Sequence, residues 1–293
     1  MELRHIRYFV VVAEECNLTR AAKRLMIAQP PLSRQIKDLE EELGTQLFVR
    51  KSKGLELTEA GHHFLSYATR ILQLSEQSVE DLHNMEDGLQ GTLYLATVEG
   101  MAPRFLSEQI KKFHARFPKV EFNLWNGNTD DVCHRVHNGL CDIAIITAPF
   151  DEESLEGVSV GKEPWIAMIP KDHPLATLKG EYIDLVKLSP YELLIPSRIS
   201  RLNEIQEWFK PYGAKPKVIG RLAHMINAYE LTRAGVGIAI YPEAAASYGA
   251  SDEIVVKKLK NPRVMAEYIL IHSRNSELSM VAREFWSMVI EEE

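Results

Sequence analysis

Cysteine is scarce in this chain of 293 residues, which contains only Cys16, Cys133 and Cys141. They form no Cys-x-x-Cys pair and have no neighbouring histidine at zinc spacing, so we expect no metal site. No apolar run reaches the roughly 20 residues that a membrane-spanning helix needs. The first residues lack the apolar core of a signal peptide. The sequence therefore predicts a cytoplasmic protein with reduced thiols and no membrane partner.

Two motifs that would mark an enzyme are also missing. The chain has no phosphate-cradling Gly-x-x-x-x-Gly-Lys run, and none of its ten histidines belongs to a His-x-x-x-His pair backed by a glutamate. We also expect no Gly-x-Ser-x-Gly nucleophile elbow. We therefore predict no cofactor, no catalytic residue and no enzymatic activity.

Acidic residues outnumber basic ones, but the charges are unevenly distributed. The formal net charge of −7 argues at first against a nucleic-acid partner. Between Arg20 and Lys53, however, eight lysines and arginines stand against four acids, a surplus of four positive charges that leaves −11 for the rest of the chain. This asymmetry favours a small basic module joined to a larger acidic one.

Residues 1–58 have the pattern of a winged helix-turn-helix. Apolar residues within 3–15 recur at the spacing of an amphipathic helix. Asn17 or Thr19 can cap a second helix, and a third runs from two prolines to Gly44, which ends it. Short apolar segments on either side of 51–54 predict a hairpin with a basic tip, the wing.

Residues 59–87 predict one long linker helix. Leu65, Ala68, Leu72, Ser75, Val79 and Leu82 recur at the alternating three- and four-residue spacing of a coiled-coil seam. We expect nothing in the same chain to cover this stripe and infer a homodimer, while packing against the chain's other domain stays open as the alternative. Residues 88–91 are the expected hinge.

From residue 88 to 293 the pattern changes to strands alternating with helices. This alternation predicts parallel sheets with right-handed crossovers. Two successive sets predict two lobes, residues 91–162 with 268–293 and residues 163–267. The fold class is therefore α+β, with a two-lobed α/β domain like that of periplasmic binding proteins. By itself this second pattern also fits a solute-binding protein or an α/β enzyme.

The N-terminal segment closely resembles the LysR-type transcriptional regulators. The resemblance is carried by residues 3–9, 21–25 and above all 29–36, Gln-Pro-Pro-Leu-Ser-Arg-Gln-Ile, and continues in register through 39–50 and 57–61. Residues 113–118, 138–145 and 234–238 resemble the family's effector domain. The family implies a transcription regulator that binds an AT-rich interrupted palindrome in double-stranded DNA. It also implies a small-molecule effector and frequently a homotetramer; RNA polymerase is a further candidate partner.

The resemblance and the chemistry of groove binding together indicate the DNA-binding residues. Side chains near the start of a recognition helix reach base edges, while basic residues around it hold phosphates. The candidates are Thr19, Gln29, Pro30, Pro31, Ser33, Arg34 and Lys37 on the helices, and Arg50, Lys51 and Lys53 on the wing. The position before Gln29 is commonly a capping serine in the family and is Ala28 here.

The effector site is expected where strands end between the lobes. Ligands of open parallel sheets bind beyond the carboxyl ends of the strands, near helix N-termini. The candidates are Glu99, Gly100, Met101, Thr129, Thr147, Ser197, Arg198 and His224. Glu99 and Gly100 replace the family's usual small hydroxyl residue. An acid there repels a carboxylate effector unless it is protonated or paired with Arg198, and it equally suits a cationic or hydroxyl-rich ligand.

Cys133 and Cys141 raise one further alternative, because some LysR-type regulators sense peroxide through two cysteines. Cys133 falls within a predicted helix, and Cys141 takes a position that is usually an apolar core residue in the family. We interpret both as structural thiols.

Overall fold

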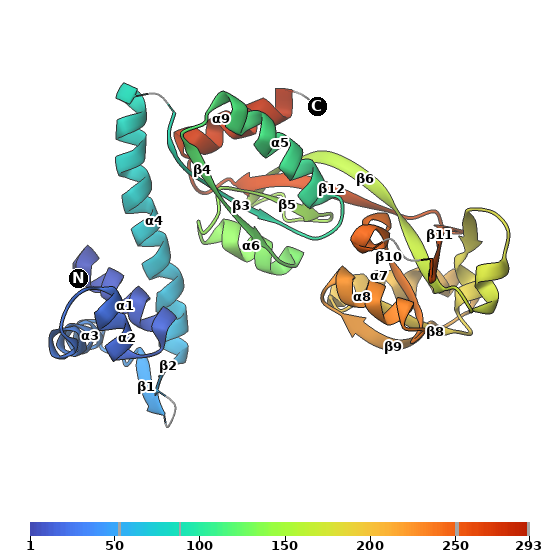
Figure 1. The fold of residues 1–293 in the computed structure, drawn as a ribbon, viewed down its shortest axis with the longest axis horizontal. Coiled ribbons are helices and arrows are strands. Elements are labelled where there is room, and N and C mark those ends of the chain that lie inside the picture. Colours follow the sequence, from blue (N-terminus) through green and yellow to red (C-terminus); the bar gives the residue numbers. More distant parts are fainter. Residues whose placement is uncertain (52–53, 88, 250–251, 292–293) are drawn as a thin grey trace.

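A computed structural model describes residues 1–51, 54–87, 89–249 and 252–291. In Figure 1 a small helical head lies at one end of a long helix, and a larger elongated domain extends from its other end. Among the described residues, no helix is long and apolar enough to cross a membrane.

The head consists of three helices around one apolar core. They are α1 (Leu3–Glu15), α2 (Leu18–Arg24) and α3 (Gln29–Leu43). Phe9, Leu32 and Leu39 are fully buried between them. Gly44 ends α3 with φ of 69°, the left-handed conformation expected of a glycine cap. Ala28 provides no side-chain cap, and prolines occupy the first turn of α3.

The predicted wing is an antiparallel hairpin of β1 (Phe48–Lys51) and β2 (Gly54–Leu57). Helix α4 follows over Glu59–Asp87. Gly61 packs α4 against Leu47, the residue before β1, where a Cβ atom would lie 2.1 Å from the Leu47 carbonyl oxygen. A larger residue there would push the helix off the head.

The stripe along α4 is covered over only part of its length, which corrects one expectation from the sequence. Leu65, Ala68 and Leu72 pack into the core of the chain's own head. Leu74, Val79 and Leu82, by contrast, are 63%, 51% and 66% exposed. The head thus covers the first half of the helix, while Leu74, Val79 and Leu82 of the second half lie on the surface.

The first lobe is a sheet with helices on both faces. Its strands are β3 (Gly91–Thr97), β4 (Val120–Asn126), β5 (Ile143–Thr147), the first part of β6 (Leu155–Pro170) and β12 (Met265–Ser273). In Figure 1, α5 (Ala102–Arg116) and α9 (Met280–Glu291) lie on one side of this sheet and α6 (Thr129–His137) on the other.

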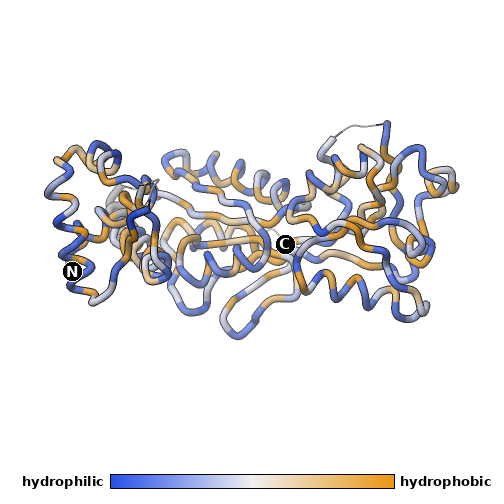
Figure 2. Tube along the Cα trace, turned by 90° about the horizontal axis from the view of Figure 1, so that it is seen from below, coloured by the Kyte–Doolittle hydropathy of each residue, from blue (hydrophilic) through white to orange (hydrophobic). Residues whose placement is uncertain are grey.

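The second lobe contains the rest of β6 with β7 (Tyr182–Asp184), β8 (Glu192–Pro196), β9 (Lys217–Leu222), β10 (Ile238–Pro242) and β11 (Ile254–Lys260). Its helices are α7 (Ile199–Phe209) and α8 (Met225–Arg233), with four short 3-10 helices at Pro174–Thr177, Leu185–Leu188, Lys210–Tyr212 and Glu243–Tyr248. Figure 2 shows apolar segments running through the interior of both lobes and hydrophilic ones along the outer helices.

The sheets are mixed, whereas the sequence predicted parallel ones. β3, β4 and β5 are parallel, as are β8, β9 and β10. β12, however, runs antiparallel to β5 and β6, and β6 runs antiparallel to β10 and β11. The reason is that β6 is one sixteen-residue strand that passes from the first lobe into the second, and the chain returns beside it through β12.

Candidate functional site

The start of the recognition helix is solvent-exposed on the head. Gln29, Pro30, Pro31 and Arg34 are exposed and Ser33 is half-buried, so the first turns of α3 are free to meet a partner. Thr19 is exposed in the first turn of α2, but it is not the cap. The cap is Asn17, whose side-chain oxygen accepts from the Thr19 and Arg20 backbone N–H groups at 2.9 and 3.0 Å.

A groove joins α3 to the wing. Ser33, Lys37 and Arg50 line it together with the apolar edge of β1. Lys37 pairs with Glu41 at 3.1 Å and Lys51 pairs with Glu56 across the hairpin. Arg34 and Arg50 form no ion pair within the described parts of the chain. The predicted residue Lys53 lies outside the described residues. Cations thus flank the exposed end of α3 from both the helix and the wing.

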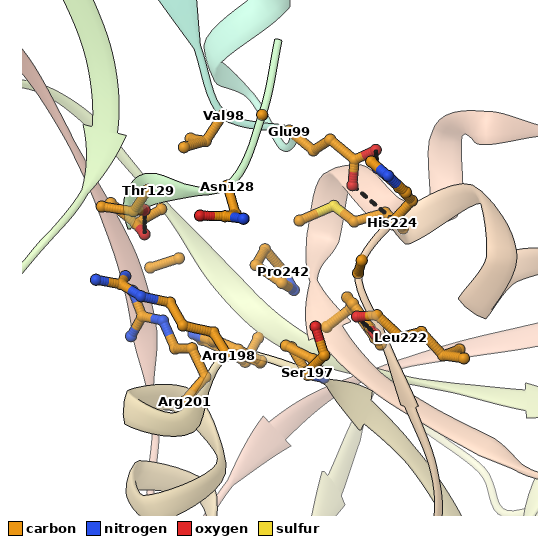
Figure 3. Close-up of a pocket in the computed structure, with 18 residues that line it drawn as sticks. Val98, Glu99, Asn128, Thr129, Ser197, Arg198, Arg201, Leu222, His224 and Pro242 are labelled. Atoms are coloured by element: carbon orange, nitrogen blue, oxygen red, sulfur yellow. Dashed lines mark hydrogen bonds and ion pairs between the residues drawn. The ribbon is translucent and has the colours of Figure 1, made fainter. Parts of the chain in front are cut away.

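The second candidate site is a cavity between the lobes of the larger domain. It encloses about 110 Å³. Six residues predicted from the sequence line it, namely Glu99, Thr129, Thr147, Ser197, Arg198 and His224. Figure 3 labels five of them, all but Thr147, and shows these five side chains reaching the cavity from both lobes.

Two hydroxyls mark the first-lobe wall of the cavity. Thr129 begins α6, and its Oγ1 lies 3.0 Å from the Thr147 Oγ1 at the end of β5. Asn128 caps α6 by accepting from the Asp131 N–H at 2.9 Å. The helix therefore presents its N-terminus at this wall, where free amides favour an acceptor oxygen.

Arg198 reaches the same region from the second lobe. Its guanidinium holds the Asp130 carboxylate of the first lobe through Nη2 at 2.8 Å and Nε at 3.2 Å. Arg201, one turn further along α7, donates to the Ala148 carbonyl at 2.8 Å. Both arginines thus bond the second lobe to the first.

Glu99 forms the opposite end of the cavity. Its carboxylate accepts from the Met225 backbone N–H at 2.6 Å and contacts the His224 Nδ1 at 3.1 Å. Glu99 is therefore not the partner of Arg198, one of the possibilities that the sequence left open. It caps α8 of the other lobe instead.

Gly100 and Met101 do not line the cavity, unlike their neighbour Glu99. Gly100, at φ +107°, leaves room for Tyr268, because a Cβ atom there would lie 1.9 Å from the phenol oxygen. The Met101 N–H donates to the buried Glu163 carboxylate at 3.2 Å. Their role in this structure is to pack and orient the loop.

Several lining residues were not singled out from the sequence. Arg201 carried a usable signal, since it follows Arg198 by one helical turn. Trp165, Leu222, Tyr241 and Pro242 did not, because strand residues of ordinary core type give no sign of facing a cavity. They form its apolar wall.

The run Gly157–Gly161 matches the Gly-x-Ser-x-Gly pattern of hydrolase nucleophiles, which we did not expect in this chain. Here it lies inside strand β6 and not on the strand-to-helix turn that the chemistry requires. Ser159 donates to Glu267 at 2.8 Å. The geometry of a nucleophile elbow is absent at this run.

Burial is the largest influence on the pKa values of Cys133 and Cys141, the two cysteines of the larger domain. It raises the pKa of the Cys141 thiol to about 12 and also raises the pKa of Cys133. A thiol with a raised pKa is less available as the reactive thiolate at neutral pH.

A winged helix-turn-helix head on a long helix, joined to two lobes around a cavity, defines a ligand-responsive DNA-binding regulator. A family model described as "LysR substrate binding domain" matches residues 86–293. A second, "Bacterial regulatory helix-turn-helix protein, lysR family", matches residues 3–62. The chain belongs to the LysR family of transcriptional regulators, with a DNA-binding and an effector-binding domain.

The similarity to known regulators extends along the whole length of the chain. The HTH-type transcriptional regulator CatR of Pseudomonas putida is 30% identical over 299 residues, covering 100% of this chain and 99% of the relative. AlsR of Bacillus subtilis (strain 168) is 28% identical over 282 residues, covering 96% and 93%. The crystal structure of CbnR, a LysR family transcriptional regulator, has a TM-score of 0.78 at 27% identity and covers 99% of both chains. These relatives are regulators and not enzymes.

Proposed function

We propose that two heads of a homodimer read the half-sites of an AT-rich interrupted palindrome. The observation that carries this proposal is the exposed N-terminus of α3 flanked by Arg34 and Arg50. Gln29 and Ser33 suit base edges, and the two prolines suit a thymine methyl group. A structure of full-length CbnR complexed with its target DNA, with a TM-score of 0.78 to this chain, supports DNA as the partner.

In this proposal the basic residues differ in whether they already form an ion pair within the head. Arg34 has no acidic partner among the described residues and lies one turn into α3, so it reaches a base or phosphate without first breaking an ion pair. Lys37 and Lys51 are paired with Glu41 and Glu56, but such exposed pairs are worth only about 0–1 kcal/mol and break readily against a phosphate. In this proposal the phosphate backbone of the DNA is held by Thr19 and by the wing residues Arg50, Lys51 and Lys53.

Substituting Arg34 tests the interface. We expect Arg34→Ala to weaken operator binding at physiological salt by more than about tenfold, because one charge-assisted contact is lost at the protein–DNA interface. Titration of an operator fragment in gel-shift assays at several salt concentrations measures both the affinity and its salt slope.

The matched control is Arg104→Ala, which removes another exposed arginine, on α5. The control should bind like the wild type. Unchanged operator affinity in Arg34→Ala, with circular dichroism like that of the wild type, would refute the assignment.

Assembly is the next part of the proposal. Exposed Leu74, Val79 and Leu82 on α4 favour pairing of two linker helices, which places the heads on one duplex. A homotetramer formed from two such dimers, and RNA polymerase as a partner when the output is activation, complete the assembly that we propose. Their tests are the mass of the operator complex and transcription in vitro.

Effector binding between the lobes controls this assembly in our proposal. Three polar connections bridge the lobes around the cavity: Glu99 to α8, Arg198 to Asp130, and Arg201 to Ala148. A ligand that replaces any of them changes the angle between the lobes and so the packing of the dimers. The ligand can change the free energy of DNA binding by no more than the difference between its own binding free energies for the two lobe arrangements.

A further inference from the structure

We propose that the effector is a small zwitterion whose ammonium and carboxylate groups lie at opposite ends of a short carbon chain. This inference rests on the proposed effector cavity and adds the chemical class of its occupant. It follows from the charges that line the cavity and from their separation in Figure 3, where Glu99 lies on one side and Arg198 with Arg201 on the other.

The Glu99 end calls for a cation. The side chain is only 17% exposed, and no lysine or arginine of the described residues pairs with it. Its partners are a backbone N–H and the imidazole of His224. A carboxylate accepts about four hydrogen bonds, so two acceptor positions remain for a ligand. An ammonium group would supply both the missing donors and the missing charge.

The Arg198 end calls for an anion. Two of the five guanidinium N–H groups hold Asp130, and within the described residues the other three make no further hydrogen bond that would compete with a ligand carboxylate. The Asp130 side chain is 68% exposed, so water can solvate it when a ligand takes its place. The Thr129 and Thr147 hydroxyls beside the start of α6 add further donors.

The space between the two ends is lined largely by apolar side chains, and the Asn128 amide also faces it. Trp165, Leu222, Tyr241 and Pro242 line it and offer contacts to methylene groups. One water-sized group needs at least about 10–15 Å³ of such space, so 110 Å³ holds at most roughly seven to eleven of them. The ω-amino acids from 4-aminobutanoate to 6-aminohexanoate lie within this limit, whereas longer members approach or exceed it.

A simple carboxylate fits the cavity less well. It would leave the Glu99 charge enclosed with no added partner and would place a second anion in the same small space. A simple amine would leave the Arg198 end with Asp130 alone. A ligand that carries both groups satisfies both ends at once, which is why we favour it.

The test uses the full-length wild-type protein and the series from glycine to 7-aminoheptanoate. We expect the thermal unfolding midpoint to rise most for the members with four to six carbons, with calorimetry giving the dissociation constants. Pentanoate and pentylamine, matched in length to 5-aminopentanoate, should bind at least about tenfold more weakly, because each leaves one charged end unpaired. Equal binding of pentanoate, absence of any optimum in length, or no response to the whole series would overturn the inference.

Two variants identify the ends. Glu99→Gln should weaken 5-aminopentanoate at least about tenfold while leaving pentanoate unchanged or tighter. Asp130→Asn, which frees Arg198, should tighten both compounds. Glu108→Gln, an exposed glutamate on α5, is the control and should behave like the wild type. Loss of affinity for both compounds alike in Glu99→Gln would contradict the inference.

The cavity itself is tested separately with Ser197→Trp, a bulky residue at an exposed rim position. If the wild type binds an uncharged or singly charged compound better than the zwitterions, and Ser197→Trp abolishes that binding, the cavity is the effector site but its ligand is not a zwitterion. Binding of 5-aminopentanoate that persists in this variant would reject the cavity.

Discussion

At the scale of single residues, Glu163 shows how one buried carboxyl group organises the boundary between the lobes. It is 6% exposed on β6. It accepts from the Met101 and Ala244 backbone N–H groups at 3.2 and 2.7 Å and from the Tyr268 phenol. The group therefore ties the first-lobe loop, the second lobe and β12 together. Gly100 is needed beside it, because any side chain would displace Tyr268.

Burial raises the pKa of Glu163 above its ordinary value of 4.5, although its hydrogen bonds oppose the shift. Because the folded pKa is the higher one, the stability contributed by this group is complete below about pH 4.5 and is lost as the pH rises through the folded value. Relative to Glu163→Gln, which does not titrate, the wild type should therefore lose stability as the pH rises from about 4.5 through the folded pKa. Urea unfolding of both proteins across this range measures the difference, and a difference that moves the other way contradicts the prediction.

At the scale of elements, α2 separates two neighbouring polar residues into different roles. Asn17 caps the helix, whereas Thr19 is exposed and only donates its backbone N–H to that cap. A side chain that accepts two otherwise free N–H groups at a helix start stabilises the helix, and a surface hydroxyl next to it does not.

Asn17→Ala should destabilise the protein by about 1 kcal/mol through loss of this cap. Thr19→Ala is the matched comparison, and its free energy of unfolding should stay within about 0.5 kcal/mol of the wild type. Its operator affinity should fall instead, as expected for a residue at the DNA surface. Urea unfolding and gel-shift titration of both variants distinguish the roles. Equal loss of stability in the two would show that the cap is not the decisive contact.

Helix α4 was predicted as an element, but the covering of its apolar stripe depended on tertiary structure. The pattern from Leu65 to Leu82 is continuous in the sequence. The head nevertheless buries Ala68 completely and leaves Leu82 two-thirds exposed. Periodicity identifies which face of a helix is apolar, but it does not say which part of the chain, or which second chain, packs against it.

At the scale of the whole molecule, the exposed half of α4 should govern assembly. Leu82→Asp places a charge on the proposed dimer seam and should shift the protein toward monomers at micromolar concentrations. Operator affinity should then fall by about tenfold or more, because binding through two linked heads is lost. Ser107→Asp, at an exposed position on α5 and away from the linker helix, is the control. Sedimentation analysis measures the mass, and an unchanged mass in Leu82→Asp would contradict the seam.

The elements formed by local patterns were predictable. The capped helices of the head and the long helix were expected because side chains three and four positions apart share one helix face. Strands β9 and β11 were missed, because their alternation mixes lysines with apolar residues and resembles exposed chain. The antiparallel pairing of β6 and β12 was also missed, since strand direction depends on partners more than 100 residues away.

By itself the sequence determined the family, the DNA-reading head and six of the residues around the cavity. These were predictable because helix periodicity, helix caps and strand ends depend on residues that are close together in the sequence. Only the tertiary structure decided that Glu99 meets His224 and that Arg198 meets Asp130, at separations of 125 and 68 residues. Such contacts form when the two lobes close on each other, and the type of either residue does not predict its partner.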